Sequence, residues 1–135
     1  MERDCGAWIN LLSRMVRRRL NATLQGLGIT AIQSRVIFYI LEHSPRQPVY
    51  QRDIESAFRL SRSTATGILQ QLERKGILLR ESVEQDARLK SLVPTARAVE
   101  LNEQVRACLR QTEALLTQGL SEGQVLLFIE TASAM

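Results

Sequence analysis

Residues 51–76 have the sequence QRDIESAFRLSRSTATGILQQLERKG. The first part, Gln51–Phe58, is long enough for about two helical turns. Ser61 is a suitable N-cap for a second helix, which ends at Lys75-Gly76 because glycine commonly follows the last helical residues. Four apolar residues of this second helix share one face: Ala65, Ile68, Leu69 and Leu72. Two helices joined by a tight turn predict a helix-turn-helix.

Two short apolar segments follow the pair of helices. Ile77–Arg80 and Lys90–Val93 are predicted strands. The intervening residues Glu81–Leu89 are polar, with Val83 as their apolar core candidate, so we expect a β-hairpin with a long charged loop. A helix-turn-helix followed by such a hairpin is a winged helix-turn-helix, whose second helix enters the major groove of DNA.

The face of the second helix opposite its apolar side carries residues suited to DNA. They are Arg62, Ser63, Thr66, Gly67, Gln70 and Arg74. Arginine and glutamine can form two hydrogen bonds to a base edge, serine and threonine reach bases or phosphates, and a helix N-terminus attracts phosphate. The alternative is an ordinary solvent-exposed helix face, but the hairpin and the basic charge favour DNA contact.

Helical patterns flank this region on both sides. Residues 8–24 form a predicted first helix, and capping boxes at Thr30/Gln33 and Ser121/Gln124 open two others. Pro94-Thr95 begins a long helix ending at Gly119, with an apolar stripe of Leu101, Val105, Cys108, Thr112 and Leu115. The expected fold is mainly α with a small β-hairpin wing (α+β), in the order α-α-α-α-β-β-α-α. Residues 1–135 form one domain, with helical regions at 1–28 and 96–135 and a winged helix-turn-helix at 29–95.

The charge of the chain is uneven. Its 135 residues carry a net charge of +4, and 16 of the 18 basic residues are arginine. Residues 98–135 contain five acidic and two basic residues, so the excess positive charge lies in the first two-thirds of the chain. This distribution predicts an anionic partner, with nucleic acid as the leading candidate.

Composition argues against several other classes of protein. Two cysteines and one histidine do not supply the four ligands of a closed zinc site, so we expect neither a metal nor a cofactor. No histidine-containing triad, apolar carboxylate pair or phosphate-binding glycine loop is visible, so we do not expect an enzyme. No apolar segment has the length of a signal peptide or membrane span, and a cytoplasmic protein is expected.

Several short motifs together resemble the MarR family of bacterial transcriptional regulators, most clearly over residues 27–95. The matching pieces are Leu27-Gly28-Ile29-Thr30, Gln51-Arg52-Asp53-Ile54, Leu60-Ser61-Arg62-Ser63-Thr64, Leu72-Glu73-Arg74-Lys75-Gly76 with Arg80, and Asp86-Ala87-Arg88. The resemblance implies a homodimer joined by its first, fifth and sixth helices, with a small-molecule or redox-sensing region next to the DNA-binding lobes. It also implies that Arg88 enters the minor groove and that Asp86 supports the wing. Where the family usually has glycine in the turn, this chain has Arg59.

The sequence therefore predicts a transcriptional regulator, in most such families a repressor, that binds a pseudopalindromic double-stranded DNA operator as a homodimer and is released by a small-molecule effector. Its predicted DNA-binding residues are Arg62, Ser63, Thr64, Thr66, Gln70, Arg74, Arg88 and Lys90. The alternative is a winged-helix module that docks a protein and has lost DNA binding.

Four further features of the sequence are candidates for a function or for the core. Trp8 and Tyr39 are candidates for an effector pocket, although large aromatic residues on apolar helix faces usually belong to a core. Cys5 is a candidate redox sensor, but reactive thiols need nearby cations or a helix N-terminus, and only Arg3 is close in sequence. Cys108 is expected in the core. The arginines at positions 17–19 either follow DNA phosphates or pair with acidic helices of a second subunit.

Overall fold

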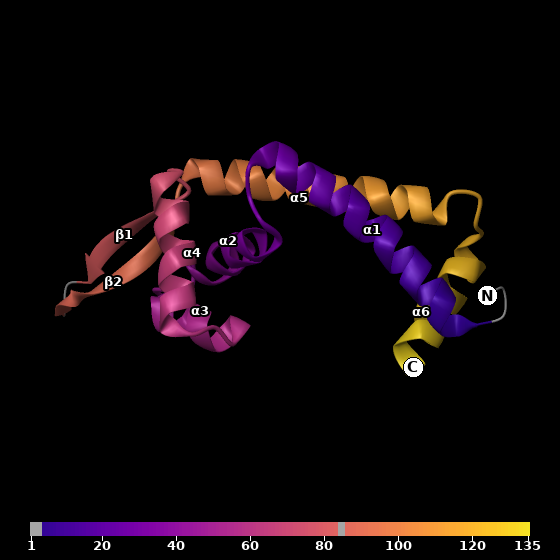
Figure 1. Cartoon of the computed structure of the whole chain (residues 1–135), viewed down its shortest axis with the longest axis horizontal. Coiled ribbons are helices and arrows are strands. Elements are labelled where there is room, and N and C mark those ends of the chain that lie inside the picture. The colour runs from indigo at the N-terminus through magenta and orange to yellow at the C-terminus, as the bar shows by residue number, and fades with distance from the viewer. Residues whose placement is uncertain (1–3, 84–85) are drawn as a thin grey trace.

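The computed structural model describes residues 4–83 and 86–135, without the side chains of residues 83, 86 and 87. Its elements are α1 (Cys5–Leu27), α2 (Ala31–His43), α3 (Gln51–Phe58), α4 (Arg62–Arg74), β1 (Leu78–Val83), β2 (Asp86–Pro94), α5 (Ala96–Thr117) and α6 (Glu122–Ala134). The predicted fold class and element order are confirmed. Figure 1 shows an elongated molecule, with a lobe of α2, α3, α4 and the hairpin at one end and an arm of α1, α5 and α6 at the other.

The arm is built on α1 and α5, which lie side by side. Polar contacts join the two helices: Arg19 Nε donates to Thr112 Oγ1 at 3.1 Å, and the Thr23 hydroxyl donates to Cys108 Sγ at 3.1 Å. Helix α1 begins at Cys5, earlier than predicted, because the Asp4 side chain accepts a hydrogen bond from the Gly6 amide and caps the helix. The arm thus extends from the lobe to the first turns of α1 and to the C-terminal helix α6 (Figure 1).

Both predicted capping boxes are present. In α2, the backbone amide of Gln33 donates to Thr30 Oγ1 at 3.2 Å, while the side-chain Oε1 of Gln33 accepts from the backbone amide of Thr30 at 3.1 Å. In α6, the same reciprocal bonds join Ser121 and Gln124. These bonds satisfy amides that have no partner within the first turn, so each helix begins where the sequence predicts.

The hairpin is longer than predicted. Its antiparallel strands pair Glu81 with Ser91 and Ser82 with Lys90, so Glu81 and Ser82, which were expected in the loop, belong to β1. The prediction was wrong because backbone hydrogen bonds form the ladder, and they do not require alternating apolar side chains. Pro94, expected to begin a helix, instead ends β2 opposite Leu78, a position at a sheet edge that proline tolerates.

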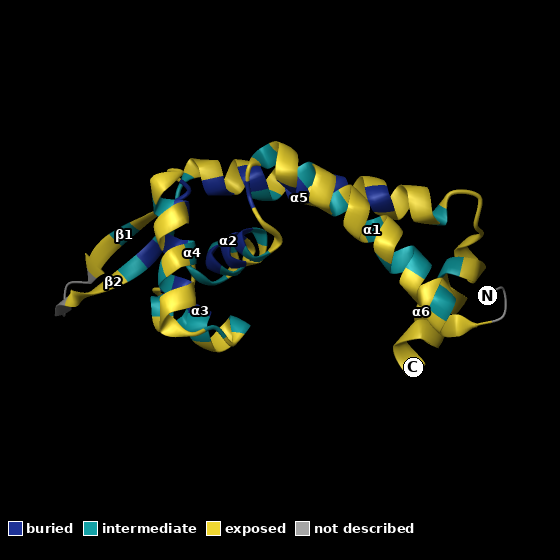
Figure 2. Cartoon of the chain, viewed as in Figure 1, coloured by how far each residue is buried: buried dark blue, intermediate teal, exposed yellow. Residues whose placement is uncertain are grey.

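The core lies mainly in the lobe, as the burial pattern in Figure 2 shows. Its fully buried large side chains are Val36, Ile40, Val49, Ile54, Leu69, Leu72, Leu78, Leu92 and Leu101. Along α5, the predicted stripe is buried at Leu101, Val105, Cys108 and Thr112. Leu115 is 51% exposed, contrary to the prediction, because no described element of the chain covers this end of α5.

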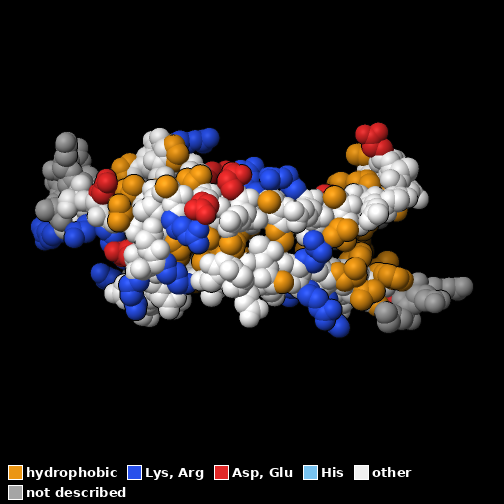
Figure 3. Space-filling model, turned by 90° about the horizontal axis from the view of Figure 1, so that it is seen from above, with side chains coloured by type: hydrophobic (Ala, Val, Ile, Leu, Met, Phe, Trp, Pro, Cys, Tyr) orange, Lys and Arg blue, Asp and Glu red, His pale blue; other side chains and the backbone are white. Residues whose placement is uncertain are grey.

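The far end of the arm exposes large apolar side chains. No residue of α6 is buried, and Leu126, Leu127, Phe128 and Ile129 are all more than half exposed. Trp8 and Ile9 of α1 and Leu115 and Leu120 are also exposed. Figure 3 shows hydrophobic side chains gathered at this end of the molecule. Such a large apolar surface is typical of an interaction site.

No single helix among the described residues is long and apolar enough to cross a membrane; helices α1 and α2 pass that test of length and composition only as a pair, bent by 79°.

Candidate nucleic-acid interface

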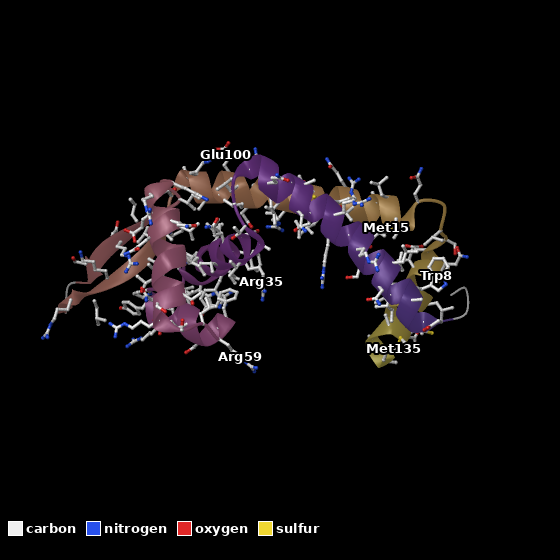
Figure 4. All side chains as sticks on the ribbon, viewed as in Figure 1. Trp8, Met15, Arg35, Arg59, Glu100 and Met135 are labelled. Atoms are coloured by element: carbon white, nitrogen blue, oxygen red, sulfur yellow. The ribbon has the colours of Figure 1, made fainter. Side chains whose placement is uncertain are left out.

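The turn between α3 and α4 has an unusual backbone conformation. Arg59 has φ +52° and ψ +49°, and it is the one residue other than glycine with positive φ in the described part of the chain. The left-handed region is unfavourable for residues with a Cβ atom. The Leu60 amide closes the turn by donating to the Glu55 carbonyl at 2.9 Å. The turn thus sets the direction in which α4 leaves α3. Figure 4 shows Arg59 at the tip of the lobe.

Helix α4 has the two faces that the sequence predicts. Ala65, Leu69 and Leu72 are fully buried, whereas Ile68 is partly exposed. The opposite face is exposed at Arg62, Ser63, Gly67, Gln70 and Arg74. The apolar face therefore fixes α4 on the core and leaves its polar face available to a partner.

Thr66 differs from its exposed neighbours because its hydroxyl is already engaged. Its Oγ1 donates to the Arg62 carbonyl at 2.8 Å and accepts from Gln51 Nε2 at 2.9 Å. Gln51 Nε2 also lies 3.3 Å from the Arg62 carbonyl. Thr66 and Gln51 therefore connect the start of α3 to the first turn of α4.

Hydroxyl groups surround the N-terminus of α4. Ser61 Oγ accepts from the Thr64 amide at 3.2 Å and donates to Thr64 Oγ1 at 2.8 Å, and Ser63 Oγ lies 3.3 Å from Ser61 Oγ. Thr64 is exposed. In these bonds the Thr64 hydroxyl oxygen acts as an acceptor, so the hydroxyl can still donate a hydrogen bond to an external acceptor.

A concave surface lies between α3, α4 and the wing, and the cavity that it encloses has a volume of about 730 Å³. Its lining residues are Tyr50, Gln51, Arg52, Glu55, Arg62, Thr66, Gln70, Glu73, Arg80, Arg88, Leu89 and Lys90. Five of them are cationic and two are acidic. One acid, Glu73, is paired with Arg80 at 2.6 Å, which leaves a positive surface with several hydrogen-bond donors.

The predicted wing residues occupy different positions on this surface. Arg88 and Lys90 of β2 are exposed and line the concavity together with Arg62 and Gln70. Arg74 is not part of its lining; its Nε lies 3.4 Å from the Gln70 carbonyl on the exposed side of α4. The side chain of Asp86 lies outside the described residues, so its predicted support of the wing stays a prediction.

Seven residues of the concave surface are absent from the predicted site: Tyr50, Gln51, Arg52, Glu55, Glu73, Arg80 and Leu89. Arg52 lies over the Tyr50 ring, with its guanidinium carbon 5.0 Å from the ring centroid. Gln51 and Arg52 open α3, so a search of the first turn of α3 for donors could have identified them. Arg80 belongs to one of the matching motifs, but its proximity to Glu73 depends on how β1 folds back beside α4.

The predicted effector and redox residues lie apart from this surface. Trp8 is at the far end of the arm (Figure 4), whereas Tyr39 lies in the lobe, stacked on His43 at 4.0 Å and edge-on to Phe58. The two aromatic residues do not line a common pocket among those of the described chain. Cys5 is an exposed free thiol in the first turn of α1, and Cys108 is buried, as expected for a core residue.

A different groove, of about 640 Å³, lies between α1, α2 and α5. Its apolar lining includes Leu20, Phe38 and Leu109, and its charged lining residues are Arg35, Glu42 and Arg106. Among the described residues, no group of three or more histidine, cysteine or acidic side chains is arranged to hold a metal.

Comparison with known proteins agrees with this architecture. Residues 27–89 match the MarR family. The solved structures with a similar fold include the S. aureus MepR–DNA complex (24% identity, TM-score 0.84, 96% of each chain covered) and a point mutant of S. aureus MepR (23% identity, TM-score 0.88, 98% of this chain and 96% of that chain). S. aureus MepR bound to ethidium bromide is also similar (24% identity, TM-score 0.78, 99% and 95% covered). No curated protein sequence matches the chain.

The elements and their order define a winged helix-turn-helix flanked by the helices of an arm. The segment that matches the family, residues 27–89, contains all of α2, α3, α4 and β1. The resemblance to the MarR family inferred from the sequence is confirmed over this segment, which is the part of the chain that the family matches.

Proposed function

We propose that the chain is a sequence-specific transcriptional repressor that binds double-stranded DNA as a homodimer. The observation that carries this proposal is the concave surface on which Arg62, Gln70 and Arg88 converge from α4 and the wing. The surface includes residues of α4, the proposed recognition helix, and of β2 in the wing, as expected for contact with a major groove and the neighbouring minor groove. The similar fold of MepR in its DNA complex supports the same function.

The side chains suggest distinct roles in DNA binding. Arg62, Ser63 and Gln70 contact base edges in the major groove, and the Thr64 hydroxyl donates a hydrogen bond to DNA. Thr66 positions Gln51 and Arg62 in addition to its predicted contact with the groove. Arg74 and Lys90 bind phosphates. Arg88 enters the minor groove, because the negative potential of a narrow minor groove attracts arginine.

The exposed apolar end of the arm supports the homodimer. A second copy could bury the exposed side chains of Leu126, Leu127, Phe128 and Ile129. Removing apolar surface from water stabilises the dimer by roughly 25 cal/mol per Å² of surface buried. A two-fold axis at this end would place two recognition helices about 10 bp apart on a pseudopalindromic operator. In this arrangement, residues 1–28 and 96–135 form the dimerisation region and residues 29–95 form the DNA-binding lobe.

The groove between α1, α2 and α5 is the proposed site of a small-molecule effector, in place of a pocket formed by Trp8 and Tyr39. It joins the arm to the lobe, so a ligand there can favour a different angle between them. The MepR structure with ethidium bromide is a precedent for a small molecule bound to a protein of this fold.

Selection of binding sites from a random duplex library tests the proposed function. We expect an enriched sequence made of two inverted half-sites. Gln70→Ala and Arg62→Ala should change or abolish the enriched half-site, whereas the matched controls Gln47→Ala and Arg46→Ala, in the exposed loop between α2 and α3, should not. A library that shows no enrichment with the wild-type protein contradicts sequence-specific binding.

A further inference from the structure

A buried polar side chain lies where α4 approaches the junction of α1 and α2. Gln33, in the first turn of α2, is only 2% exposed. Its Nε2 donates to Gln71 Oε1 on α4 at 2.7 Å. Its Oε1 accepts from the Thr30 amide at 3.1 Å and from Lys75 Nζ at 3.3 Å. Both ends of this buried amide therefore have partners, and two of the partners belong to the α4 region.

Lys75 extends the connection to α1. Its Nζ donates to the Gly28 carbonyl at 2.7 Å. Gly28 is the C-cap of α1 and has φ +72°, a conformation that glycine adopts without steric cost. Lys75 is itself the C-cap of α4. An ammonium group at the C-terminus of α1 is favourable because that end of a helix carries partial negative charge.

We name Gly28, Gln33, Gln71 and Lys75 the cap bracket. In the described part of the chain, the hydrogen bonds that join α4 to α1, α2 or the turn between them are those of the cap bracket. Val36 of α2 and Leu69 of α4 both belong to the buried apolar core. Apolar packing is non-directional, so the bracket supplies the directional contacts between the recognition helix and the arm.

The location of the bracket relates it to DNA binding. Gln71 and Lys75 immediately follow the predicted DNA contacts Gln70 and Arg74 on α4. Gly28 ends the long arm helix whose other end carries Trp8 and the exposed apolar surface. A change at the bracket would therefore tilt α4 relative to the dimer axis without altering the side chains that contact DNA.

We propose that Gln33 and Lys75 are positioning residues that fix the recognition helix relative to the arm and thereby set the spacing between the two half-sites of the operator. This inference rests on the proposed function, because spacing has meaning only for a dimer on DNA. Neither side chain contacts DNA in this role. Removal of the bracket should relax the spacing while the sequence of each half-site is retained.

The test compares site selection by the wild-type protein, Lys75→Met and Gln33→Met. Methionine keeps most of the side-chain volume and removes the polar contacts. Two controls make the same kinds of replacement in the exposed loop between α2 and α3, away from the bracket: Gln47→Met replaces one amide, and Arg46→Met removes one charge. Thermal unfolding of all variants shows whether each one folds.

The wild-type protein and both controls should enrich one spacing and lose about tenfold or more in affinity when 1 bp is inserted between half-sites. Lys75→Met and Gln33→Met should enrich the same half-sites at several spacings, with a loss below about threefold for the same insertion. An unchanged spacing preference in both bracket variants would overturn the proposal, since a purely structural role lowers stability and not spacing selectivity.

Amide hydrogen exchange on the free protein decides the question independently of DNA. Exchange at residues 28–30 and 71–76 should accelerate on the order of tenfold in Lys75→Met, because these segments no longer hold each other in place, while the remainder of α1 stays protected. Equal exchange in the wild-type protein and the variant would overturn the bracket. If the wild-type protein enriched no DNA sequence, the proposed function would fail, and the exchange result would still test the positioning contact.

Discussion

Arg80 Nε donates a hydrogen bond to Glu73 Oε1 at 2.6 Å, and this ion pair joins the first strand of the wing to the recognition helix. The two side chains are 26% and 34% exposed, so the pair is partly shielded from solvent. It has two consequences. It fixes the angle between β1 and α4, and it neutralises an acid within a surface otherwise rich in arginine.

We expect the ion pair to be measurable in a double-mutant cycle of Glu73→Gln and Arg80→Met. The coupling free energy of unfolding should be about 0.5–1 kcal/mol and should fall as salt increases, since partial exposure permits screening. Arg80→Met alone should weaken DNA binding more than the double variant does, because it leaves Glu73 unpaired beside the phosphates. Zero coupling, with no recovery of affinity in the double variant, would show that the pair has neither role.

Arg59 should strain the turn that it occupies. Arg59→Gly should raise the free energy of unfolding by about 0.5–1 kcal/mol, because an L-residue in the left-handed region costs about 1–2 kcal/mol and the extra chain entropy of glycine offsets part of the gain. Denaturant unfolding measures this change. Arg46→Gly, in a loop without positive φ, is the matched control and should not stabilise the protein.

The same variant tests whether Arg59 binds a DNA phosphate. If it does, the slope of log affinity against log salt should decrease in magnitude by about 2 in Arg59→Gly, because the proposed dimer loses one phosphate contact from each protomer. A stabilised protein with an unchanged slope would mean that Arg59 affects only the turn.

Arg88 should contribute strongly to DNA affinity. Arg88→Ala should weaken binding to the selected operator by about 1–3 kcal/mol if the side chain enters the minor groove. Arg97→Ala is the matched control: Arg97 lies on α5, where it pairs with Glu100 at 3.1 Å. Fluorescence anisotropy with both variants distinguishes a local contact from a general loss of positive charge. If the two substitutions weakened DNA binding equally, Arg88 would make no specific contact with DNA.

The apolar surface of the arm should hold the dimer together. Phe128 is 61% exposed in the single chain, so Phe128→Glu should not disturb the core of the protomer. It should raise the dimer dissociation constant by about a hundredfold, because a charge would be buried at the centre of the interface. Analytical ultracentrifugation measures this constant, with Gln111→Glu on the exposed polar side of α5 as the control. A wild-type chain that remains monomeric at micromolar concentration would contradict the dimer.

Much of the fold could be predicted because its determinants are local. The capping boxes at Thr30 and Ser121 involve residues only three apart, and the two faces of α4 follow from helical periodicity. The length of the wing could not be predicted in this way, since Ser82 and Lys90 pair through their backbones. The prediction for Leu115 was wrong because helical periodicity indicates an apolar stripe but does not tell which chain covers it.

The candidate site was predictable to a similar degree. The exposed side of α4 and the position of Arg88 could be identified from sequence, whereas Gln51 and Arg80 join the surface only through tertiary contacts with Thr66 and Glu73. The bond between Lys75 and the Gly28 carbonyl spans 47 positions in the chain. Such long-range polar contacts are not encoded in local periodicity, which is why the cap bracket was not apparent from sequence.

The most direct test of the central claim is a titration of a fluorescent DNA fragment from immediately upstream of the protein's own coding sequence, compared with a scrambled fragment at two salt concentrations. We predict tight binding that prefers the native fragment and weakens steeply as salt rises, because phosphate contacts release counterions. Equally weak binding to both fragments, together with a salt-insensitive interaction with a protein partner, would contradict the account and favour a winged helix that docks proteins.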